Sequence, residues 1–131
     1  MRALATPAAG HRLMIAQVTP AEVVSGVARR RREGSIPPRT AHAIRLLVDR
    51  HTRREYTVIA LRAQVLRHTE DLLETHALRA YDAVQLASAL ESNNRMVAAG
   101  LVALVFVSAD KRLLDVAITE GLETEDPAAH P

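Results

Sequence analysis

Three acidic side chains, Glu22, Asp82 and Asp110, occupy comparable positions although they lie far apart along the chain. Glu22 follows the short apolar run at residues 13–18. Asp110 follows the apolar run at residues 104–107, and Asp82 opens a long apolar segment. In folds where parallel strands alternate with helices, positions of this kind gather beyond the carboxyl ends of the strands. The spacing therefore predicts that the three carboxylates meet at one edge of a sheet.

Carboxylates that share one place point to chemistry with a divalent cation. They repel each other, and a hard cation such as Mg²⁺ or Mn²⁺ relieves that repulsion through the oxygen ligands that it prefers. Such a cation orients a phosphodiester, activates water and stabilises the departing oxygen. Ser108, two residues before Asp110, is placed to hold a metal-bound water or to orient one carboxylate. For Asp82 a simpler role stays open, because Asp is a preferred residue at helix N-caps.

Apolar periodicity and turn residues define the elements that must position these acids. Strands are expected at residues 13–18, 56–60 and 104–107, and helices at residues 20–32, 40–54, 61–75, 82–99 and 110–120. Thr19 is expected to cap the first helix, with Pro20 at its first position. Strands that alternate with helices favour an α/β fold, in which a parallel sheet carries helices on both faces. We expect a single domain over residues 1–131, with a loose end after Gly121.

Two of the expected helices have a clear apolar face. On the helix that opens at Asp82, this face holds Ala83, Val84, Ala87 and Leu90. On the helix over residues 61–75, it holds Val65, Leu66, Thr69, Leu72 and Leu73. These residues are the candidate core positions of the two helices.

The composition excludes several classes of protein. With 48% hydrophobic residues the chain of 131 residues can build a core, but one Phe, two Tyr and no Trp give no stacking platform for single-stranded bases. The absence of cysteine excludes disulfides and thiolate zinc sites, and fits a cytoplasmic protein. The six histidines show no paired ligand spacing and are expected at the surface or in packing contacts. We find no run long enough to span a bilayer and expect no membrane association.

The basic residues are nearly all arginines, with Lys111 the sole lysine, although the net charge is only +2. Arginine binds phosphate bidentately, so the run Arg29, Arg30, Arg31 and Arg32 is a candidate contact for nucleic acid. Codon bias in a GC-rich genome would also enrich arginine, and cations followed by Gly34 are typical of a helix C-terminus. The sequence therefore leaves open whether the run binds nucleic acid, completes a helix end or reflects codon usage.

Three segments together resemble the PIN-domain ribonucleases, and more closely the VapC-like toxins of type II toxin–antitoxin pairs. These are VTPAEV at residues 18–23, LRAYDAVQLA at residues 78–87 and FVSADKRLL at residues 106–114. The resemblance implies a PIN-like fold and an endoribonuclease that depends on Mg²⁺ or Mn²⁺, with Glu22, Asp82 and Asp110 as metal-site acids. It also implies an RNA substrate, a cognate antitoxin protein that blocks the site, and a homodimer.

The chain departs from the family pattern at its start. That pattern begins with a strand that ends in Asp, and residues 1–12 contain nothing that matches it. Either Met1 is an internal start within a longer reading frame, or the chain is a truncated, degenerate member. For the 131 residues as they stand, the departure predicts a missing metal ligand, weak or absent cleavage and poor stability as a monomer.

Two alternative functions stay open. The first is a truncated PIN domain without catalysis that only binds an antitoxin or dimerises. The second is a receiver-like or phosphatase-like domain that acts on small phosphates. The sequence favours the second less, because such a domain needs an Asp nucleophile on its first strand and none is seen.

Overall fold

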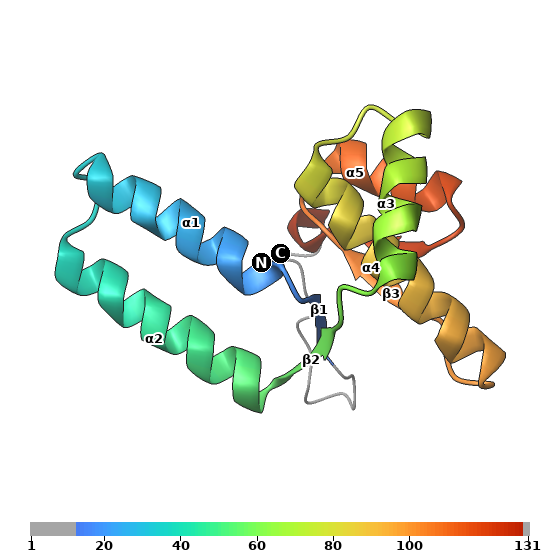
Figure 1. Cartoon of the computed structure of the whole chain (residues 1–131), viewed down its shortest axis with the longest axis horizontal. Helices are drawn as coiled ribbons and strands as arrows, with labels where there is room; N and C mark the ends of the chain where they lie inside the picture. The colour runs from blue at the N-terminus through green and yellow to red at the C-terminus, as the bar shows by residue number, and fades with distance from the viewer. Residues whose placement is uncertain (1–12, 130–131) are drawn as a thin grey trace.

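A computed structural model describes residues 13–129 of the protein (Figure 1). The described residues form five α-helices and four short strands in parallel pairs, which confirms the predicted α/β class. In chain order the elements are β1 (Leu13–Ala16), α1 (Thr19–Arg32), α2 (Pro38–Arg54), β2 (Tyr56–Ile59), α3 (Ala63–Thr75), α4 (Ala80–Ala98), β3 (Val105–Val107), α5 (Lys111–Thr119) and β4 (Glu123–Glu125), followed by a 3-10 turn (Pro127–Ala129). Within residues 13–129, no helix is both long and apolar enough to cross a membrane.

The described strands form two separate two-stranded sheets, both parallel. β1 pairs with β2, so that Leu13 lies opposite Tyr56 and Ala16 opposite Ile59. β3 pairs with β4 from Val105 to Val107. The expectation of a loose chain end was wrong here, because residues 123–125 form β4. Their sequence, Glu-Thr-Glu, carries no apolar pattern, and the strand exists because its backbone pairs with β3.

Helices α1 and α2 form an antiparallel hairpin that extends away from the rest of the molecule (Figure 1). α1 ends at Arg32, and Gly34 then adopts a left-handed conformation with φ of +79°. Glycine reaches this conformation without a steric penalty, which is why it commonly ends helices. Pro37 and Pro38 follow at the start of α2, where a missing backbone N–H costs nothing. The bounds of the two helices therefore lie within two residues of the predicted ranges, 20–32 and 40–54.

Helix α4 is the centre of the core. Leu86 is fully buried, and the cluster around it includes Val65 and Leu72 of α3, Phe106 of β3 and Leu113 of α5. Because α4 is covered on several sides, its buried residues extend beyond the predicted face. Ala83, Ala87 and Leu90 are buried as expected, and Val84 is only half-buried. The additional buried residues are Gln85, Leu86, Ser88 and Ala89.

Helix α3 is buried on one side only. Val65, Thr69 and Leu72 face α4, as the periodicity predicts. Leu66 and Leu73 were expected to be buried as well, and this was wrong, because they are 43% and 38% exposed. The apolar face of α3 is wider than the part of it that the neighbouring helix α4 covers, so its outer leucines stay partly exposed.

The N-cap residues of α1 and α4 differ from those that the sequence suggested. Thr19 was expected to cap α1, but Val18 is the N-cap and Thr19 is a buried residue of the first turn. Asp82 is not an N-cap either, since that position in α4 belongs to Arg79, without a side-chain capping bond. Asp110 does cap α5, because its side chain accepts hydrogen bonds from two backbone N–H groups. The simpler role considered for Asp82 is thus held by Asp110.

Candidate functional site

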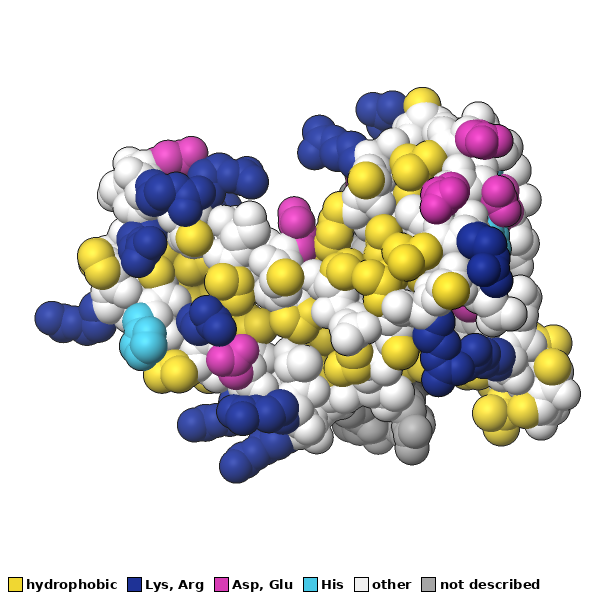
Figure 2. Space-filling model, in the orientation of Figure 1, with side chains coloured by type: hydrophobic (Ala, Val, Ile, Leu, Met, Phe, Trp, Pro, Cys, Tyr) yellow, Lys and Arg dark blue, Asp and Glu magenta, His cyan; other side chains and the backbone are white. Residues whose placement is uncertain are grey.

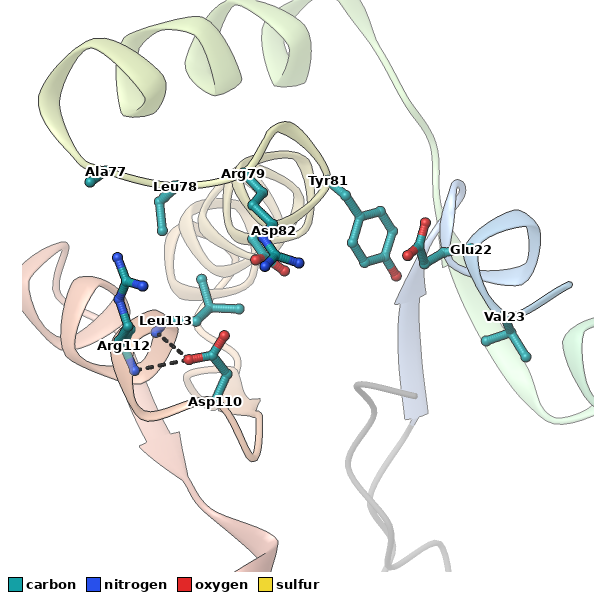
Figure 3. A pocket seen from close by; sticks show the side chains of 10 residues that line it. All are labelled: Glu22, Val23, Ala77, Leu78, Arg79, Tyr81, Asp82, Asp110, Arg112 and Leu113. Atoms are coloured by element: carbon teal, nitrogen blue, oxygen red, sulfur yellow. Dashed lines mark hydrogen bonds between the residues drawn. The ribbon is translucent and has the colours of Figure 1, made fainter. Parts of the chain in front are cut away.

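All three predicted carboxylates line one cavity of about 670 Å³ (Figure 3). Glu22 comes from the first turn of α1, Asp82 from the first turn of α4, and Asp110 from the N-cap of α5. The starts of three helices thus border one space, although 88 residues separate the first acid from the last. Helix N-termini carry partial positive charge, which favours anionic groups in and around such a cavity.

Asp110 is held in place by its own loop. Its Oδ1 atom accepts hydrogen bonds from the backbone N–H groups of Arg112 at 3.0 Å and Leu113 at 3.3 Å (Figure 3). The buried Ser108 hydroxyl accepts a hydrogen bond from the backbone N–H of Asp110 at 3.1 Å. Ser108 was expected to orient a carboxylate or to hold a metal-bound water. The structure shows it fixing the backbone from which the Asp110 carboxylate projects.

Tyr81 divides the acids within the cavity. In Figure 3 its ring lies between Asp82 on one side and Glu22 on the other, while Asp82 and Asp110 share the same side. Asp82 and Asp110 are half-buried and Glu22 is exposed. The cavity therefore contains a pair of partly desolvated carboxylates and a third, more hydrated one across the tyrosine.

A buried polar contact connects the two helices that carry Glu22 and Asp82. The Gln85 side-chain amide donates to the Thr19 hydroxyl at 3.1 Å, and also to the Tyr81 hydroxyl. Thr19 is 1% exposed and Gln85 is 5% exposed, so this contact is shielded from water. It attaches the first turn of α1 to the first two turns of α4. Sequence reasoning missed this contact, because it weighed apolar periodicity and acidic residues only.

Substitution of Gln85 by Leu should destabilise the protein by about 1–3 kcal/mol, because the buried Thr19 hydroxyl loses its partner. The double variant Thr19→Val with Gln85→Leu should be more stable than Gln85→Leu alone, since neither buried polar group is then left unpaired. Urea unfolding of the four proteins of this cycle measures the coupling. Strictly additive effects would mean that the Thr19–Gln85 bond does not hold the two helices together.

The donor set of the cavity suits a hard divalent cation, because it consists of carboxylate oxygens. Among residues 13–129, no group of three acidic or histidine side chains is placed to hold a metal ion by itself. Mg²⁺ does not require such a cage, since it commonly binds through one or two carboxylates together with waters and substrate phosphates. Asp82 and Asp110 fit that mode, and Glu22 lies further along the same cavity.

The arginine run predicted as a nucleic-acid contact lies at the far end of the helical hairpin. Arg29, Arg30, Arg31 and Arg32 form the last turn of α1, and all four are exposed. The hairpin as a whole is basic: residues 19–54 hold nine of the seventeen Lys and Arg residues and three carboxylates. Figure 2 shows Lys and Arg side chains gathered over this part of the molecule. The position at a helix end agrees with a dipole role for these cations and leaves the guanidinium groups accessible.

The described histidines lie outside the cavity. His68 of α3 contacts Glu91 of α4 at 3.0 Å, and His76 contacts Glu120 at 2.7 Å. Both contacts are partly buried and join neighbouring elements, which confirms that these two histidines serve packing.

Comparison with protein-family models matches residues 2–118 to the PIN domain. The match covers most of the chain, including Glu22, Asp82 and Asp110, and the chain belongs to the PIN domain family. PIN domains are nucleases that act on RNA or DNA and generally depend on divalent metal ions. A search of curated proteins finds no match.

Proposed function

We propose that the protein is a divalent-metal-dependent endoribonuclease and the toxin component of a VapC-like toxin–antitoxin pair. One observation carries the proposal: Glu22, Asp82 and Asp110 extend from the starts of three helices into one cavity. The membership of the PIN family supports nuclease activity in general. The choice of RNA and of the VapC-like subtype rests on the three segments at residues 18–23, 78–87 and 106–114 that resemble those toxins.

In this proposal Asp82 and Asp110 hold Mg²⁺ or Mn²⁺, and Glu22 completes the acidic lining. The cation, when bound, supplies positive charge beside the phosphodiester and its attacking water. Ser108 keeps the Asp110 carboxylate directed into the cavity through its bond to the Asp110 backbone. Gln85 fixes the start of α1, and with it Glu22, against α4. The exposed arginine run at residues 29–32 contacts further phosphates of the RNA.

The proposal also covers the domain organisation, the binding partners and the cellular location of the protein. We propose that residues 1–131 form one PIN-like domain, that it works as a homodimer in the cytoplasm, and that a small antitoxin protein blocks the cavity. The match over residues 2–118 supports the single domain. The antitoxin and the homodimer rest on the resemblance to VapC-like toxins alone.

The test is cleavage of RNA by the full chain in Mg²⁺ or Mn²⁺, with and without EDTA. We expect slow internal cleavage of the RNA with either metal, as the departure from the family pattern at residues 1–12 implies, and no cleavage in EDTA. Intact RNA under all of these conditions would contradict the proposed enzyme.

The second candidate is a PIN domain that binds its antitoxin without cutting RNA. It is favoured by the departure from the family pattern at residues 1–12, where nothing in the sequence matches the strand that ends in Asp. This candidate predicts no metal-dependent hydrolysis, together with retained capture of the antitoxin in a pull-down. Metal-dependent cleavage would exclude it.

A further inference from the structure

Two arginines line the same cavity as the three acids, and the proposed site does not yet use them. Arg79 is the N-cap of α4, and Arg112 lies in the first turn of α5. In Figure 3 the Arg79 side chain overlies Asp82, and Arg112 rises from α5 beside Asp110. Both arginines therefore border the side of the cavity that holds the Asp82 and Asp110 pair, on the opposite side of Tyr81 from Glu22.

Neither guanidinium group forms an ion pair with another side chain among the described residues. The ion pairs found within residues 13–129 involve Arg45 and three histidines, and none of them includes Arg79 or Arg112. Both arginines are also exposed, so their N–H donors are accessible from the cavity. Two accessible guanidinium groups beside two carboxylates are an unusual lining for a site that only collects cations, because they repel a cation.

A phosphodiester accounts for this mixed lining. Guanidinium groups bind phosphate oxygens through paired N–H donors, and carboxylates do not. The start of α4, whose N-cap makes no side-chain capping bond, adds backbone N–H groups and a positive dipole end on the same side. An RNA backbone entering the cavity can thus meet positive charge at Arg79 and Arg112 next to the acids that are proposed to hold the metal.

We propose that Arg79 and Arg112 form a phosphate clamp, which binds the RNA backbone at the nucleotides next to the bond that is cut. This inference rests on the proposed function for the position of the cut. Binding of RNA by the clamp does not depend on a metal, because the guanidinium groups carry their own charge. The clamp therefore predicts RNA binding in a chelator.

The experiment measures binding of a fluorescein-labelled, mixed-sequence single-stranded RNA to the full chain by anisotropy, in EDTA and over a range of KCl concentrations. We expect Arg79→Ala and Arg112→Ala each to weaken binding by about tenfold. Each should also lower the slope of log K against log salt by about 0.7, the value for one phosphate contact to a single strand. Arg79→Lys and Arg112→Lys should keep the slope, because they keep the charge, and lose part of the affinity.

The matched control is Arg95→Ala. Arg95 is an exposed arginine in the last turn of α4, at the other end of the helix from Arg79 and roughly 24 Å away along it. The Arg95→Ala variant should bind RNA with an affinity within about twofold of that of the unmodified protein, because only the small effect of net charge remains. Circular dichroism melts of all variants show whether the fold is kept, as expected for exposed side chains.

Two results would overturn the clamp: no RNA binding by the unmodified protein in EDTA, or Arg79→Ala and Arg112→Ala variants that bind with the affinity and salt slope of Arg95→Ala. The failure of the proposed function has a different signature. In that case RNA binding depends on Arg79 and Arg112, yet Mg²⁺ and Mn²⁺ produce no cleavage.

Discussion

Asp82→Asn is expected to lower metal-dependent RNA cleavage by about 100-fold or more. Asp82 is one of two half-buried carboxylates on the same side of the cavity, and Asn removes its charge while keeping its size. Loss of groups that merely orient a metal ligand costs about 10- to 100-fold in affinity or activity, and a ligand itself should cost no less. Initial rates of RNA cleavage in Mg²⁺ and in Mn²⁺ measure the effect.

The matched control for this variant is Asp115→Asn. Asp115 is an exposed aspartate on α5, five residues beyond Asp110, and it does not line the cavity. This variant should cut RNA at the unmodified rate. Equal cleavage by Asp82→Asn and the unmodified protein would place the active site elsewhere.

Leu86→Ala is expected to destabilise the protein by about 2–5 kcal/mol, the range for removal of a fully buried Leu side chain. Leu86 is 0% exposed, and it belongs to the cluster that joins α4 to α3, β3 and α5. For a domain of this length the melting temperature should fall by roughly 10 °C or more. Urea and thermal unfolding followed by circular dichroism measure the two quantities.

Leu46→Ala provides the comparison for a leucine outside the core. Leu46 lies on α2 and is 55% exposed, so its truncation should change the free energy of unfolding by no more than about 0.5 kcal/mol. A Leu86→Ala variant as stable as Leu46→Ala would show that the packing around α4 does not stabilise the fold.

The sequence predicted best what local chemistry decides. Gly34 follows α1 with positive φ, as its position after the arginine run predicted. The runs that became β1, β2 and β3 were recognisable from their apolar and β-branched residues. The gathering of the acids around one cavity was inferred from a rule about parallel strands, without any local signal in the sequence.

What the sequence did not predict depends on contacts between distant segments. Residues 123–125 form a strand because β3 lies beside them, although nothing in their composition favours one. Thr19 is buried in the first turn of α1, where its hydroxyl is satisfied by Gln85, which is 66 residues away. Leu73 has the right spacing for a core residue, but it stays 38% exposed among the residues that the structure describes. Periodicity shows which residues share a face, and only tertiary packing determines how much of that face is covered.

Binding of Mn²⁺ by the full chain, followed by electron paramagnetic resonance, tests the proposed metal site most directly. The unmodified protein should remove the signal of about one free Mn²⁺ ion per chain. Asp82→Asn and Asp110→Asn should each weaken this binding by about tenfold or more. Asn caps helices as well as Asp does, so Asp110→Asn should keep the start of α5 intact. Binding of Mn²⁺ by both variants with the affinity of the unmodified protein would contradict the assignment of these acids to a metal site.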